Sequence, residues 1–251
     1  MKKLYLSIAI YYFLNTAVKS ALLPSDLEKC RYGDSSCIIK SINDLIRRYP
    51  KGIPEMGLPP LDATPLNDIP ILNSSYRGPI WLTFHMRDTV NKGFNNATVT
   101  HVAGFNRDPR KEKLVIKARI PRLIHEATYD MQGQIMLFKS NTTGKLQSDF
   151  QNVNVTLTFK IILEYRNNKR YLKIYELVPL VSLDRWIILL DNLYKENIDL
   201  TVILNRVFNE HWVELWNDLE PGLMHAFSLA FSRILNKVFE NVAYDDLFLP
   251  D

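Results

Sequence analysis

The chain has 251 residues, of which 47% are hydrophobic and 23% are charged, and its formal net charge is +4. This balance excludes a disordered, collagen-like or polytopic membrane protein, and the length suffices for a domain with a sizeable core. Residues 1–20 hold three lysines and no acid, so the remainder is nearly neutral. A nearly neutral body gives no electrostatic reason to expect nucleic acid as a partner.

The first twenty residues have the pattern of a secretory signal peptide. Two lysines precede the mostly apolar stretch 4–18, and small or polar residues follow it before Ala21. The stretch is short for a bilayer span, so a cleaved signal at residues 1–20 is favoured over an uncleaved anchor. The predicted mature protein is a single domain of residues 21–251 that is secreted into the extracellular space.

Cys30 and Cys37 are the two cysteines of the chain. In an oxidising compartment such neighbours pair more often than they stay free, so a disulfide is predicted. Metal chemistry would require further ligands nearby, and neither a metal nor another cofactor is expected. Glycosylation is predicted at the four N-x-S/T sequons, whose asparagines are Asn73, Asn96, Asn141 and Asn154.

An amphipathic helix and an irregular connector are predicted next. Asp34 or Ser35 can cap a helix in which apolar residues recur every three or four positions until Pro50. The segment 51–70 is rich in proline, which excludes a helix or a central strand. We therefore expect an extended connector along the surface.

Residues 78–180 change to a pattern in which apolar and polar side chains alternate. The alternation is clearest in 153–163 and predicts half-buried antiparallel strands. Further strands are predicted at 80–86, 99–105, 114–120 and 127–137, with turns at 106–109, 141–144 and 167–168. His101 has the parity of the apolar residues in its strand and is expected to point inward.

From Asp199 to Val242, apolar residues return at helical spacing. Pro221 and Gly222 are expected to kink this long helix or to split it. Because a helix this apolar needs a large apolar partner, the predicted fold is α+β, with a long kinked C-terminal helix wrapped by a strongly curved antiparallel β-sheet. Asp245–Asp246 is expected to form a solvated turn.

The sequence contains no recognisable catalytic constellation. It lacks the sequence motifs of serine hydrolases, zinc proteases, P-loop proteins and dinucleotide-binding proteins, and its histidines have no metal-ligand spacing. His211 and Glu214 are interpreted as a surface pair. A non-enzymatic protein is therefore expected.

Several motifs occur in a characteristic order: the paired cysteines, KGIPEMGLPPLD at 51–62, Tyr129-x-x-x-Gly133, NRVFNEHWVELWNDLEPGL at 205–223 and YDDLF at 244–248. Together they resemble the insect takeout and juvenile-hormone-binding protein family over essentially the whole mature chain. The resemblance implies an N-terminal disulfide and an apolar tunnel between helix and sheet. It also implies a lipid-like ligand, such as the sesquiterpenoid juvenile hormone, and links to circadian or feeding physiology.

The resulting hypothesis is a secreted, monomeric carrier of a terpenoid or fatty-acid-like ligand, without stable membrane insertion. The candidate ligand-binding residues on the sheet and the helix are Phe84, Val99, Ile116, Tyr129, Met131, Ile135, Val155, Leu157, Phe159, Trp212, Leu215, Phe227 and Phe231. Tyr129 adds a hydroxyl to an apolar face, where a ligand group or a backbone carbonyl could be its partner. The alternative is a secreted signalling protein that docks to a cell-surface receptor and transports no ligand.

Overall fold

The computed structural model describes residues 20–66, 69–73, 80–135, 138–195 and 197–250. The predicted signal peptide lies outside this part of the chain except for Ser20. The described strands are β1 (Thr64–Leu66), β2 (Ile69–Asn73), β3 (Ile80–Lys92), β4 (Thr98–Ala103), β5 (Leu114–Ile135), β6 (Phe138–Arg166), β7 (Lys169–Ser182) and β8 (Arg185–Leu190). The α-helices are α2 (Ser35–Arg48), α3 (Ile198–Glu210) and α4 (Trp212–Asn241), and the 3-10 helices are η1 (Pro54–Met56), η2 (Phe94–Asn96) and η3 (Tyr244–Leu247).

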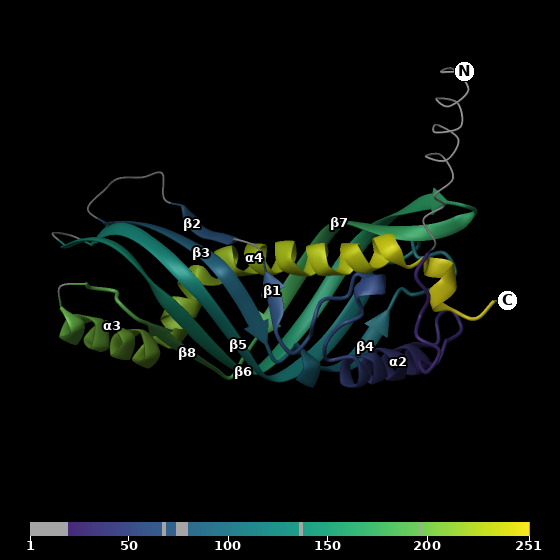
Figure 1. Ribbon diagram of the computed structural model, residues 1–251, viewed down its shortest axis with the longest axis horizontal. Coiled ribbons are helices and arrows are strands. Elements are labelled where there is room, and N and C mark those ends of the chain that lie inside the picture. The colour runs from purple at the N-terminus through teal and green to yellow at the C-terminus, as the bar shows by residue number, and fades with distance from the viewer. Residues whose placement is uncertain (1–19, 67–68, 74–79, 136–137, 196, 251) are drawn as a thin grey trace, which may run out of the picture.

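In the described part of the chain, the strands form one antiparallel sheet in the order β1-β3-β5-β6-β7. β2 also pairs with β3, β4 with β5, and β8 with β6. Figure 1 shows this sheet curving around α4, which runs along its concave side. The predicted α+β fold, with a sheet wrapped around a C-terminal helix, is confirmed.

The two central strands are longer than predicted. The expected strand 114–120 and residues 127–135 of the expected strand 127–137 are parts of the 22-residue β5, and residues 136–137 lie outside the described part of the chain. The turn expected at 141–144 is wrong because these residues lie inside the 29-residue β6. Gly144 is needed for packing in the strand. A Cβ at Gly144 would lie 2.7 Å from Cε1 of Tyr129, its partner across the strands. The turn at 167–168 is confirmed as the β6–β7 hairpin, where both asparagines have positive φ.

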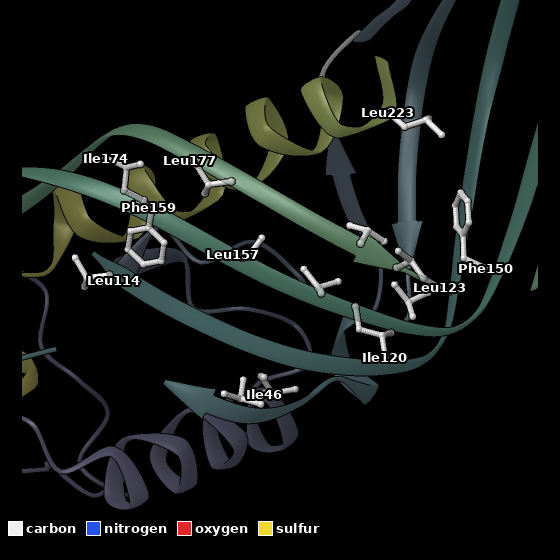
Figure 2. Close-up of a cluster of buried hydrophobic side chains, with 14 of the residues drawn as sticks. Ile46, Leu114, Ile120, Leu123, Phe150, Leu157, Phe159, Ile174, Leu177 and Leu223 are labelled. Atoms are coloured by element: carbon white, nitrogen blue, oxygen red, sulfur yellow. The ribbon is translucent and has the colours of Figure 1, made fainter. Parts of the chain in front are cut away.

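Local irregularities give the sheet its curvature. Pro121 interrupts the ladder inside β5, and Asn152, at φ 50°, interrupts it inside β6 between the parts that pair with β8 and β7. Figure 2 shows these strands curving beside Ile120 and Phe150. A further bulge in β4 falls between Val99 and His101. It changes the side-chain parity, so the expectation that His101 points inward is wrong: His101 is exposed.

The C-terminal helical region is split, but not where proline predicts. α3 ends at Glu210 and α4 starts at Trp212, whereas Pro221 lies inside α4. At His211 the backbone leaves the helical region, with φ −108° and ψ 34°. The break lets α3 follow β8 while α4 crosses the sheet to β7.

Asparagine side chains fasten the helices to the outer strands. Asn205 and Asn209 of α3 each bond the backbone N–H and C=O of one β8 residue, at 2.7–2.9 Å. Asn236 of α4 does the same to Ile174 of β7, and Asn43 of α2 to Val99 of β4. These amides satisfy peptide groups at sheet edges, which would otherwise be free to pair with another chain.

The hydrophobic core fills the space between the sheet and the helices. Figure 2 shows side chains of β5, β6 and β7 gathered on the side of α4, with Ile46 reaching towards the strands from α2. Phe159 and Leu114 have no exposed surface. The connector 51–70 is more structured than expected, because it holds η1, buried Met56 and the short strand β1. Pro65 is tolerated within β1 because β1 is an edge strand.

The two ends of the domain are held together. The predicted disulfide between Cys30 and Cys37 is present, and Asp34 caps the predicted helix by accepting a hydrogen bond from Cys37 N. The solvated turn expected at Asp245–Asp246 is wrong. Arg170 Nε lies 2.8 Å from Oδ1 of Asp245, and Asp246 is paired with Lys169. Burial tends to raise the pKa of Asp245, but the bonds from Arg170 outweigh it and keep the pKa below its usual value.

Candidate ligand-binding cavity

A cavity of about 280 Å³ lies between the curved sheet and α4. Its walls come chiefly from β3, β5, β6, β8, α3 and α4, and most of the lining side chains are apolar. Small residues on α4, Ala226 and Ala230, face this larger chamber, and large ones such as Phe84 and Trp186 form the sheet side. Such a concave apolar volume is typical of small-molecule sites.

A second cavity of about 180 Å³ lies towards α2. Ile46 of α2, the connector residues Leu58 and Leu61, and strands β4, β5 and β6 form its walls together with α4. This smaller chamber is also lined mainly by aliphatic and aromatic side chains. A bound molecule would therefore meet little except hydrocarbon in it.

A narrow space of about 20 Å³ lies between the two chambers. It shares Phe227 and Ala230 with the larger chamber, and Phe94 and Phe231 with the smaller one. The Phe94 and Phe231 rings meet edge to face with centroids 6.0 Å apart. The geometry is thus two chambers in line under α4, joined at an aromatic constriction.

Nine of the thirteen predicted ligand-binding residues line these chambers. The larger chamber is lined by Phe84, Met131, Leu215 and Phe227, and the smaller one by Val99, Ile116, Val155, Leu157 and Phe231. Alternation in the strands and helical spacing in α4 therefore identified the correct faces. Contact with a ligand remains a prediction for each of them.

Three predicted residues lie elsewhere, and Ile135 lies in β5 outside the described side chains. Tyr129 is fully buried behind Phe84, and its hydroxyl donates to the carbonyl oxygen of Asp191, one of the two partner types expected. Burial raises the pKa of the Tyr129 phenol, so the hydroxyl stays protonated. Phe159 packs between aromatic rings of the core, and Trp212 lies under the guanidinium group of Arg185.

Sequence reasoning missed a polar strip in the larger chamber. Asn91 of β3, His125 of β5 and Ser148 of β6 all line it. The sequence feature that was missed is the position of His125 in its strand. His125 lies two residues from each of the buried residues Leu123 and Ala127, so all three side chains lie on the same face of β5. Burial lowers the pKa of His125 to about 4, which keeps the imidazole neutral at physiological pH.

Three further features of the described part of the chain concern metal ligands, membrane-spanning helices and glycosylation sequons. Among the described residues, no group of three or more His, Cys, Asp or Glu side chains is placed to hold a metal ion, and no helix there is long and apolar enough to cross a membrane. The sequon asparagines Asn96, Asn141 and Asn154 are exposed. Asn73 lies in β2, where its side chain is outside the described part.

A curved antiparallel sheet that encloses apolar chambers against a long helix defines a class of hydrophobic-ligand-binding proteins. The chain belongs to the haemolymph juvenile hormone binding protein (JHBP) family, which it matches over residues 8–249. This is a family of hydrophobic-ligand carriers rather than of enzymes. The family resemblance read from the sequence is therefore confirmed.

Individual relatives agree with this assignment. The chain is 25% identical over 228 residues to the circadian clock-controlled protein daywake of Drosophila yakuba, and 26% identical over 229 residues to that of Drosophila melanogaster. Each alignment covers 90% of this chain and 88% of the relative. The crystal structure of Takeout 1 from Epiphyas postvittana matches with a TM-score of 0.71 at 18% identity, over 86% of this chain and 97% of Takeout 1, which supports the fold.

Proposed function

We propose that this protein is a secreted, non-enzymatic carrier that binds one hydrophobic small molecule in the two chambers under α4. The observation that supports it most directly is the pair of apolar cavities, about 280 and about 180 Å³, which meet at the constriction formed by Phe94, Phe227 and Phe231. An elongated ligand such as a terpenoid or a fatty-acid-like lipid has the matching shape.

Burial of apolar surface is the driving force that we assign to binding. At about 25 cal/mol per Å² of apolar surface removed from water, a long-chain molecule gains several kcal/mol in such an environment. The walls of both chambers are mostly apolar along their length, so affinity depends mainly on ligand length and width. A preformed cavity also lowers the ordering cost of binding.

Secretion and glycosylation belong to the same proposal. The signal peptide expected at residues 1–20 would direct residues 21–251 to an oxidising compartment, where the Cys30–Cys37 disulfide is stable. Exposed sequons at Asn96, Asn141 and Asn154 leave room for glycans. The name of the daywake relatives supports a link between this carrier and circadian physiology.

The test is mass spectrometry of an organic extract from the protein purified after secretion. We expect a stoichiometric long-chain apolar molecule, and saturable uptake of a fluorescent fatty-acid probe after delipidation. Extraction from an unrelated protein secreted by the same host is the control for host lipids. An empty extract together with no saturable uptake would refute the carrier function.

A second candidate function is docking to a cell-surface receptor without ligand transport. Exposed apolar side chains on α3 favour it, because Ile198, Val202 and Ile203 are 78%, 54% and 54% exposed. Under this alternative, charged substitutions of these residues abolish signalling while the extract contains no ligand. If the carrier proposal holds, the same substitutions leave probe uptake unchanged.

A further inference from the structure

A polar strip crosses the wall of the larger chamber at one level. Asn91, His125 and Ser148 occupy adjacent strands and are direct partners in register, Asn91 with His125 and His125 with Ser148. Direct partners on antiparallel strands have Cβ atoms about 4.5–5.5 Å apart. All three side chains are at least nine-tenths buried, with exposures of 3%, 9% and 2%.

The hydrogen bond to Asn91 fixes the tautomer of His125. Nδ1 of His125 lies 2.7 Å from Oδ1 of Asn91, and an amide oxygen accepts but cannot donate. Because the imidazole is neutral, the single ring hydrogen is on Nδ1. Nε2 therefore carries a lone pair and acts as an acceptor.

Nε2 of His125 and Nε1 of Trp186, which lines the same chamber, are both buried without a hydrogen-bond partner among the described residues. Polar atoms in protein interiors are nearly always bonded, and an unsatisfied one is costly. The His125 ring lines the larger chamber, so a molecule that fills the chamber comes into contact with the ring. Nε2 of His125 lacks a donor and the N–H of Trp186 lacks an acceptor, and a hydroxyl group can act as either.

The lining residues of the larger chamber limit which kind of hydrogen-bond donor a ligand can present. Among the described lining residues of the larger chamber there is no lysine, arginine or acidic side chain, and His125 is the one titratable group. A carboxylate there would be desolvated without a cation, and it would bring a second acceptor to Nε2. A hydroxyl group or an undissociated carboxyl group supplies the missing hydrogen without a charge.

We infer that His125 is the polar anchor of the ligand site, and that it selects ligands whose polar end donates a hydrogen bond, alcohols above all, over ethers, esters and hydrocarbons of equal length. Asn91 is a positioning residue, since it fixes the tautomer without meeting the ligand's hydroxyl group. This inference rests on the proposed carrier function and adds orientation to it, because the hydroxyl end lies at the β3–β5–β6 wall of the larger chamber.

The test compares dodecanol, methyl dodecyl ether and dodecane on the delipidated secreted protein. We expect dodecanol to bind about five- to tenfold more tightly than the ether, the effect of one buried neutral hydrogen bond. The ether offers only an acceptor, so dodecanol should keep its advantage over both the ether and dodecane. In His125→Phe the preference for dodecanol should disappear while dodecane affinity persists. His101→Phe, the same exchange at an exposed histidine outside the chamber, is the matched control and should keep the preference.

Nitrogen NMR of the wild-type protein makes the test independent of how the variant folds. The Nε2 resonance of His125 should shift when dodecanol binds and stay in place when dodecane binds. Equal affinity for dodecanol and ether, an unshifted resonance, or a His125→Phe variant that retains the preference overturns this inference alone. Failure of all three ligands to bind saturably overturns the carrier proposal itself, so the two failures are distinguishable.

Discussion

Filling the smaller chamber should weaken long ligands selectively, whereas filling the larger one should weaken short and long ligands alike. Ala118 lines the smaller chamber and Ala226 the larger one, and each exchange to phenylalanine places a ring into the cavity. At about 0.8 kcal/mol per buried methylene, displacement of about four ligand methylenes costs about 3 kcal/mol, or roughly a hundredfold in Kd. Ala118→Phe should therefore weaken hexadecanol, which extends through both chambers, and leave decanol unchanged. Ala226→Phe should weaken both alcohols.

The assay is a titration of each alcohol into the delipidated protein, in which calorimetry measures the binding. The two variants control one another, because the same ring is added on opposite sides of the constriction. Thermal unfolding shows whether either exchange damages the fold, since overpacking typically costs about 1–3 kcal/mol. The reasoning is refuted if Ala118→Phe weakens decanol as strongly as hexadecanol, or if neither variant changes either affinity.

Three further predictions concern stability. Asn43→Ala leaves both bonded peptide groups of Val99 unsatisfied and should cost about 2–4 kcal/mol, measured by urea unfolding against the neighbouring Ser41→Ala. Burial lowers the pKa of His125 from 6.5 to about 4, so the unfolded chain takes up the proton first. Stability should be full above pH 6.5 and fall by about 3 kcal/mol towards pH 4, a loss absent from His125→Phe. Replacing both Cys30 and Cys37 by alanine should cost about 2–3 kcal/mol, read as a lower urea midpoint, and an unchanged midpoint would contradict the predicted role of the disulfide.

The sequence was most informative where burial imposes a regular period. Alternation in 153–163 and the helical spacing after Asp199 gave the correct element types and the cavity-facing sides. Both patterns arise because one side of an element is buried and the other is solvated. They therefore predicted the curved sheet and the long helix, and nine of the thirteen candidate residues lie on the chamber walls.

Local sequence preference failed where a distant contact decides the conformation. The segment 141–144 has the composition of a turn, but it pairs with residues 129–132 of β5, and its glycine leaves the space that Asp191 and the Tyr129 ring occupy. Pro221 stays inside α4, whereas the helix breaks at His211, where Asn205 and Asn209 tie α3 to β8. A pattern of residues within one segment cannot reveal these contacts, because the contacting residues belong to other segments of the chain.

The polar strip could not be found from composition for a related reason. A lone histidine in a strand usually has a structural role, and His125 becomes notable only when the register places it between Asn91 and Ser148. The bulge in β4 gives the opposite example, because it moves His101 out to solvent despite its parity. Register and bulges, which depend on neighbouring strands, therefore decided which histidine reaches the cavity.

The cavities persist because polar bonds, rather than apolar contact alone, set the height of α4 above the sheet. Ser228 Oγ donates to the carbonyl oxygen of Leu177, and Asn236 bonds both peptide groups of Ile174, so the helix is tied to β7 on one side. On the chamber side of α4, Ala226 and Ala230 leave space between longer residues such as Leu223 and Phe227. At about 24 cal/mol per Å³, a dry cavity of about 280 Å³ forgoes roughly 7 kcal/mol of packing, comparable with the whole stability of many domains. A hydrophobic ligand that fills it restores much of that packing, so saturation with dodecanol should raise the unfolding temperature more than any surface exchange on the same helix.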